Sequence, residues 1–146
     1  MLTSVSNPAG GWSLLPYAAQ ELEDVQHALP NNLDITLCTD VHNIVGRVTM
    51  APTVTNVLKN LSKASLIHLA CHGYQDVNKA LQSGFVLQDN MLTVAQLMAQ
   101  NLSQPQLAFL SACETAKGDK AQPNQAIHLA ATMLFVGFPS VIGTLW

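Results

Sequence analysis

Two continuous apolar runs set the strongest constraint on the fold of this 146-residue chain. They span residues 65–71, which read SLIHLAC, and residues 107–112, which read LAFLSA. Apolar residues that do not alternate with polar ones indicate strands buried on both faces, as in a parallel sheet covered by helices. Segments with helical spacing separate these runs, an order typical of α/β proteins. The pattern therefore predicts an α/β fold built on a largely parallel sheet.

Weaker signals predict the remaining elements. Helices are expected to begin near Pro16, Thr53 and Thr93, and a last helix is expected to contain Ile127 and Met133. Further strands are expected at residues 2–5, 33–38, 85–87 and 141–146. A glycine at position 73 is expected to end the strand that begins at residue 66.

The composition excludes two classes of protein. The chain is 49% hydrophobic and 10% charged, whereas disordered chains combine low hydrophobicity with high net charge. Six Lys and Arg stand against nine Asp and Glu, and without a basic cluster this balance argues against nucleic-acid binding. The length predicts one domain over residues 1–146. Residues 1–46 hold five acids and no Lys or Arg, which we interpret as a solvated acidic first helix.

Membrane and metal signals are weak. The longest nearly apolar run, residues 126–138, has 13 residues, and a membrane span needs about 20. No signal peptide is visible. The three cysteines, Cys38, Cys71 and Cys113, form no C-x-x-C pair, which favours reduced thiols and offers no zinc-site spacing. We therefore expect a cytoplasmic protein without a membrane segment, a metal or a cofactor.

Reactive side chains follow both buried runs. His72 comes directly after Cys71, and Cys113 comes directly after Ala112. Functional residues collect at the carboxyl ends of parallel strands, so neighbouring strands would bring His72 and Cys113 together. A nearby base turns a thiol into an effective nucleophile. The backbone N–H of Gly73 could then stabilise an oxyanion.

Two neighbours of His72 favour structural roles. His68 lies in the middle of the first run and is expected to be a hydrogen-bonded core histidine. Cys71 and His72 are adjacent in a strand, so their side chains point to opposite faces of the sheet. Only one of them can be directed at Cys113, and we expect Cys71 in the core.

Several blocks of the sequence resemble a known family. The blocks are IHLACHG at residues 67–73, SGFVL at 83–87, LT at 92–93, LSACET at 110–115 and SVIGTLW at 140–146. Their order and spacing resemble the CHAT domain, a caspase-like fold often attached to tetratricopeptide repeats. The resemblance extends over residues 1–146.

The resemblance implies a cysteine peptidase of the caspase and separase type. Carried over by position, Cys113 is the nucleophile, His72 is the general base, and the backbone N–H groups of Gly73 and Cys113 form the oxyanion hole. The implied architecture is a three-layer sandwich, with a mostly parallel caspase-like sheet flanked by helices. The implied partners are a protein or peptide substrate and a fused or bound tetratricopeptide-repeat region.

Some positions bear on the cleft or depart from the family pattern. Glu114 could orient the site or bind a substrate cation, and a plain surface residue after a strand is the alternative. Asp76 and Asp89 lie on expected loops near the cleft, with turn formation as the alternative role. Family members commonly have Gly where this chain has Ala116. They usually continue past the final Leu-Trp, so the chain is expected to be truncated at its C-terminus.

Two functions stay open from the sequence. We favour a cysteine endopeptidase module that a repeat or sensor partner regulates. The alternative is a catalytically silent, peptidase-like scaffold or protein-interaction domain, which low charge and an expected exposed apolar edge support. Labelling of Cys113 by a thiol probe well below pH 8.5 would discriminate the two, because only an activated thiol reacts there.

Overall fold

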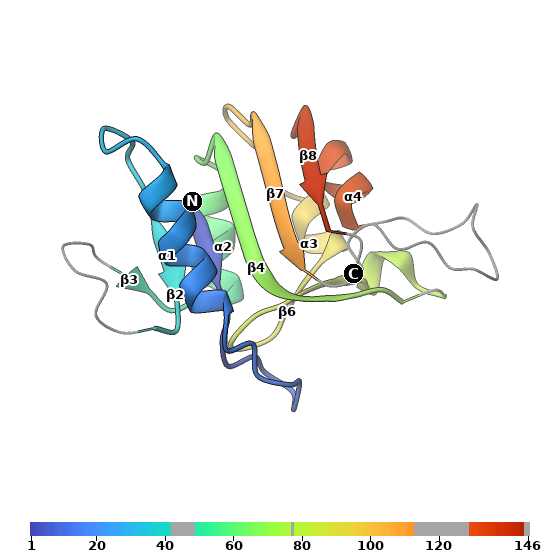
Figure 1. Cartoon of the computed structure of the whole chain (residues 1–146). Helices are drawn as coiled ribbons and strands as arrows, with labels where there is room; N and C mark the ends of the chain where they lie inside the picture. The colour runs from blue at the N-terminus through green and yellow to red at the C-terminus, as the bar shows by residue number, and fades with distance from the viewer. Residues whose placement is uncertain (42–48, 77, 113–128, 145–146) are drawn as a thin grey trace.

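The computed structural model describes residues 1–41, 49–76, 78–112 and 129–144 (Figure 1). These residues form one eight-stranded sheet with helices on both faces. The strands are β1 (Leu2–Ser4), β2 (Leu37–Thr39), β3 (Thr49–Met50), β4 (Leu66–Tyr74), β5 (Gly84–Val86), β6 (Met91–Thr93), β7 (Leu107–Ala112) and β8 (Ser140–Gly143). The helices are α1 (Ala18–Ala28), α2 (Val54–Leu61), α3 (Val94–Met98) and α4 (Leu129–Val136), with a 3-10 turn at Ala80–Gln82.

Strand β4 is the centre of the sheet. Parallel pairing joins the strands in the order β3-β2-β1-β4-β7-β8. The last parallel pair of β4 and β7 is Cys71 with Ala112. Beyond it, β4 continues through His72 to Tyr74 and pairs antiparallel with β5, which pairs with β6. The prediction that Gly73 ends the strand is therefore wrong, because β5 supplies a second set of ladder partners.

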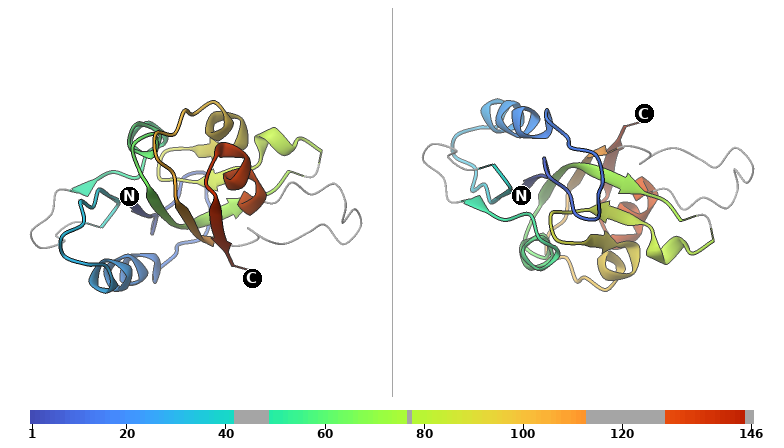
Figure 2. Two further views of the ribbon diagram at one scale, coloured as in Figure 1. Left: turned by 90° about the horizontal axis from the view of Figure 1, so that it is seen from above. Right: turned by 90° about the horizontal axis from the view of Figure 1, so that it is seen from below.

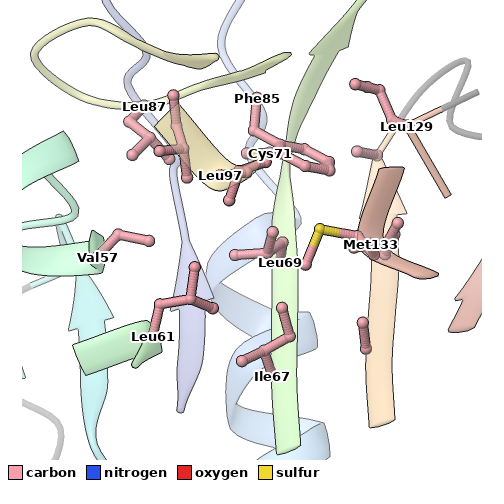
Figure 3. Packing of buried hydrophobic residues seen from close by; sticks show 14 of the residues in the cluster. Val57, Leu61, Ile67, Leu69, Cys71, Phe85, Leu87, Leu97, Leu129 and Met133 are labelled. Atoms are coloured by element: carbon pink, nitrogen blue, oxygen red, sulfur yellow. The ribbon is translucent and has the colours of Figure 1, made fainter. Parts of the chain in front are cut away.

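The helices form a layer on each side of the sheet. Figure 2 shows α1 on one face and α2, α3 and α4 on the other. The larger core lies under the three helices, where Ile67, Leu69 and Cys71 of β4 meet Leu61 of α2 and Met133 of α4 (Figure 3). Each fully buried aliphatic side chain of this kind contributes about 1.5–3 kcal/mol. The three-layer α/β architecture and the core position of Cys71 are both as predicted.

A smaller core holds α1 against the opposite face. Leu22 of α1 is buried against Leu2 of β1 and Leu37 of β2, with Val25 and Leu29 packed around them. The spacing of Leu22, Val25 and Leu29 is that of one helix face. This packing sets α1 beside the amino-terminal half of β4.

Element boundaries differ from the sequence prediction in places. The strand expected over residues 33–38 begins only at Leu37, and Leu33 is exposed. Strand β3 is two residues long and too short to leave an alternating pattern. The last strand starts at Ser140, one residue early, while residues 145–146 lie outside the described part, as does Ile127 of the expected last helix. Among the described residues, no helix has the length and hydropathy needed to cross a bilayer.

Candidate functional site

His72 lies where β4 changes from parallel to antiparallel partners. Only 8% of the surface of His72 is exposed. By strand alternation it shares the α1 face of the sheet with His68 and Ala70, whereas Cys71 faces the core under the other helices. Because the parallel pairing with β7 ends at Cys71, His72 occupies the carboxyl end of the parallel sheet. The structure thus places His72 where functional residues of such sheets collect.

The loop between β1 and α1 folds back over this position. The two carboxylate oxygens of Asp40 accept the backbone N–H groups of Ser6, at 2.9 Å, and Asn7, at 2.6 Å. Gly10 and Gly11 turn the chain with φ values of 71° and 75°, a conformation that side chains disfavour. The anchored turn brings residues 12 and 13 onto the ring of His72.

One hydrogen bond determines which ring nitrogen of His72 carries a proton. Nε2 of His72 lies 2.8 Å from the carbonyl oxygen of Ser13 and 3.3 Å from its Oγ. A carbonyl oxygen can only accept, so Nε2 must donate. In the neutral ring Nδ1 is then unprotonated and can act as a base.

The aromatic ring of Trp12 covers the same histidine. The ring centroid of Trp12 lies 5.2 Å from that of His72 at an interplanar angle of 35°. Tyr74 meets Trp12 edge to face at 6.1 Å. Ring pairs at these separations attract each other and limit ring rotation. Trp12 and Ser13 together explain why the ring of His72 is oriented and mostly shielded from water.

A second polar cluster lies on the same face of the sheet, around His68, four residues before His72. Oε1 of Glu21 accepts from Nε2 of His68 at 2.9 Å, and Oε2 accepts from Oγ of Ser111 at 2.9 Å. Burial by itself would raise the pKa of Glu21, but the hydrogen bonds from His68 and Ser111 and the charge interaction with His68 outweigh it, so the pKa is lowered. Glu21 is therefore ionised at neutral pH.

Two predictions from the sequence concern residues of this cluster. His68 is a buried core residue as predicted, but only Nε2 has a hydrogen-bond partner in the described chain, while Nδ1 has none. The interpretation of the first helix as a wholly solvated acidic face is wrong for Glu21. Its side chain is 34% exposed and reaches across the sheet to β4 and β7.

The match to a family model covers residues 4–146 and is to the CHAT domain. The chain belongs to the CHAT domain family. A comparison with curated proteins finds no match. Membership agrees with the mostly parallel, caspase-like α/β architecture of the described residues.

Two of the residues expected in the site of this CHAT domain, Cys113 and Glu114, lie outside the described residues. Ala112, which precedes Cys113 in sequence, is the last described residue of β7 and is the partner of Cys71. Gly73 is buried within β4, opposite Phe85 of β5.

The two aspartates expected near the cleft have structural contacts. Oδ1 of Asp76 accepts the backbone N–H groups of Asn78 and Lys79, each at 2.9 Å, which makes it a turn residue. Oδ1 of Asp89 accepts the backbone N–H of Val54 at 2.9 Å, at the start of α2. None of the hydrogen bonds of the described residues joins either aspartate to His72.

Trp12, Ser13 and Glu21 are site residues that the sequence analysis missed. Glu21 had a usable signal, since it follows Ala18 by three residues and precedes Val25 by four, which places it beside the buried helix face. Ser13 acts through its backbone carbonyl, and no side-chain pattern reports that. The described residues contain no group of three or more His, Cys, Asp or Glu that could hold a metal ion.

Proposed function

We propose that this CHAT domain is a cysteine endopeptidase module in which His72 and Cys113 form the catalytic dyad. The observation that carries the proposal is the 2.8 Å hydrogen bond from Nε2 of His72 to the carbonyl of Ser13. It orients the ring and leaves Nδ1 as the base at the carboxyl end of the parallel sheet. Ala112 pairs with Cys71 in the sheet. Because Ala112 directly precedes Cys113 and Cys71 directly precedes His72, this pairing supports Cys113 as the partner of His72.

The proposed reaction is acyl transfer to the thiol. Nδ1 of His72 takes the proton of the Cys113 thiol, and the sulfur forms a bond to the scissile carbonyl carbon. The backbone N–H groups of Gly73 and Cys113 stabilise the oxyanion. The imidazolium then protonates the leaving amine as the C–N bond breaks. Water hydrolyses the thioester, with His72 again accepting a proton, and regenerates the thiol.

The wider setting of the module is part of the same proposal. We expect residues 1–146 to act as one domain in the cytoplasm, regulated by a tetratricopeptide-repeat region or another sensor that is fused or bound to it. The buried thiol of Cys38, which forms no disulfide, supports a reducing compartment.

A fluorescent acyloxymethyl ketone tests the dyad directly. Wild-type protein should be labelled, Cys113→Ala should not, and His72→Ala should be labelled at least about tenfold more slowly, since a general base contributes about 10²–10⁴-fold. His27→Ala is the matched control, because His27 is exposed on α1. Labelling that persists in Cys113→Ala would refute the assignment of the nucleophile.

The shielding of His72 favours a second candidate function. His72 is 8% exposed, and the ring of Trp12 lies against its imidazole. A catalytically silent scaffold or interaction domain would tolerate this cover. Absence of probe labelling in wild-type protein with native circular dichroism would favour the scaffold.

A further inference from the structure

A pocket of about 170 Å³ opens on the sheet next to the strand that carries His72. Its walls come from residues 15–18, which lead into α1, from Ala70 and Cys71 of β4 and from Ser111 of β7, and Glu21 lines it as well. Ala70 precedes His72 by two residues, a distance of about 6.6 Å along a strand. A side chain seated in the pocket would therefore belong to a backbone that passes next to His72.

The size of the pocket limits its occupant. A water molecule takes up about 30 Å³ in the liquid, so the volume of about 170 Å³ holds five or six groups of that size. A lysine side chain has five heavy atoms beyond Cα. Leu15, Pro16, Ala18 and Ala70 offer apolar walls for its methylene groups.

A charged side chain distinguishes this pocket from a purely apolar pocket. Among the described residues that line it, Glu21 is the one with a charged side chain. Each oxygen of Glu21 accepts one hydrogen bond, from His68 or from Ser111, so about two of its four acceptor positions remain. The residue is partly exposed, and the pocket gives access to it.

His68 and Ser111 hold the carboxylate of Glu21 at the wall of the pocket. Nε2 of His68, a residue that is 1% exposed, donates to Oε1 of Glu21 at 2.9 Å. The side chain of Glu21 itself is 34% exposed, so a ligand in the pocket can reach its carboxylate.

We infer that this pocket binds a lysine side chain of the substrate, at the residue whose carbonyl is cleaved, and that Glu21 selects it by binding the ammonium group. The inference rests on the proposed endopeptidase function for the reaction, and on the pocket alone for the binding. Glu21 is thus a specificity-determining residue, held in place by His68 and Ser111.

Substrate pairs that differ only in charge test the selection in wild-type protein. Peptides with lysine or norleucine before the cleaved bond have side chains of similar length, and only lysine carries an ammonium group. We expect kcat/KM to be about 10- to 100-fold higher for lysine, the range expected for a hydrogen bond to a charged group. A ratio within about threefold of one would overturn the inference while leaving the endopeptidase proposal intact.

Variants of α1 assign the selection to one carboxylate. Glu21→Gln should reduce the lysine-to-norleucine ratio to near one, mainly through loss of the lysine substrate. Asp24→Asn removes the same charge from an exposed position of the same helix and should keep the wild-type ratio. Equal loss of the ratio in both variants would show a general charge effect and would count against the pocket.

A binding measurement separates failure of the pocket from failure of the dyad. In Cys113→Ala protein, n-butylammonium should shift the amide NMR signals of Ala18 and Ser111, and neutral n-butanol should shift them less. Specific binding without cleavage of any peptide would uphold the pocket and refute the peptidase. The same weak shifts for both compounds would refute the pocket, whether or not peptides are cleaved.

Discussion

Replacing Gly84 by alanine tests how tightly the β5–β6 hairpin is packed beside His72. A Cβ at Gly84 would lie 2.2 Å from the carbonyl oxygen of Leu92 and 2.9 Å from Cα of Thr93. Ordinary contacts of a Cβ begin at 3.4 Å, so β5 and β6 would have to separate by about 1 Å. The obstacle is backbone, which cannot rotate away as a side chain can. Gly84 therefore has no room for a side chain.

The expected cost follows from this geometry. Overpacking typically costs about 1–3 kcal/mol, and each ladder hydrogen bond stretched in the hairpin adds about 0.5–1.5 kcal/mol. We expect Gly84→Ala to lower the free energy of unfolding by about 3 kcal/mol. For a chain of this size that corresponds to a Tm lowered by roughly 6–12 °C.

Urea unfolding followed by circular dichroism measures this loss. Gly11→Ala is the matched control, because Gly11 has a φ of 75° and nothing within 4 Å of the added Cβ. Its backbone strain alone should cost about 1–2 kcal/mol. If Gly84→Ala costs less than Gly11→Ala, the close approach of β5 and β6 is not a real constraint and the reasoning fails. Because His72 lies opposite Val86 of β5, labelling of Cys113 by the acyloxymethyl ketone should also be slower in Gly84→Ala.

Three further predictions concern local contacts. Thr93→Ala removes the capping box of α3 and should cost about 1 kcal/mol in urea unfolding, whereas no change would mean that the cap is dispensable. Because the pKa of Glu21 is lowered in the folded protein, its ionised form stabilises the fold above its ordinary pKa of 4.5, and this contribution disappears as the pH falls through the lowered pKa. Glu21→Gln should therefore lose stability less steeply in acid than wild type, measured as Tm against pH, and parallel curves would contradict the pKa shift. Burial raises the pKa of the Cys38 thiol, so iodoacetamide should alkylate Cys38 in native protein at least about tenfold more slowly than in urea, and equal rates would show that the thiol is accessible.

Local sequence patterns determined much of the fold. The apolar runs at residues 65–71 and 107–112 form the strands β4 and β7, as predicted, and the structure pairs these two strands in parallel. Thr53 and Thr93 cap α2 and α3, because a hydroxyl at that position accepts the backbone N–H three residues later. Such features depend on residues close together in sequence, so their signals survive without knowledge of the whole fold.

Part of the site was also visible in the sequence. The position of His72 at the end of the parallel sheet followed from the run that precedes it, and the match of residues 4–146 to the CHAT domain agrees with the blocks around it. The pairing of His72 with Cys113 stays a prediction, since Cys113 lies outside the described residues.

Only the tertiary structure decided how the surroundings of His72 are built. Strand β4 continues past Gly73 because β5 pairs with it. The carbonyl of Ser13 reaches Nε2 of His72 because Asp40 anchors the loop between β1 and α1. Glu21 meets Ser111, 90 residues away in sequence, only once α1 packs on the sheet. These contacts join backbone groups, or residues that are far apart in sequence. The periodicity of a sequence predicts which face of a helix or strand is buried, but it does not predict which other element packs on that face.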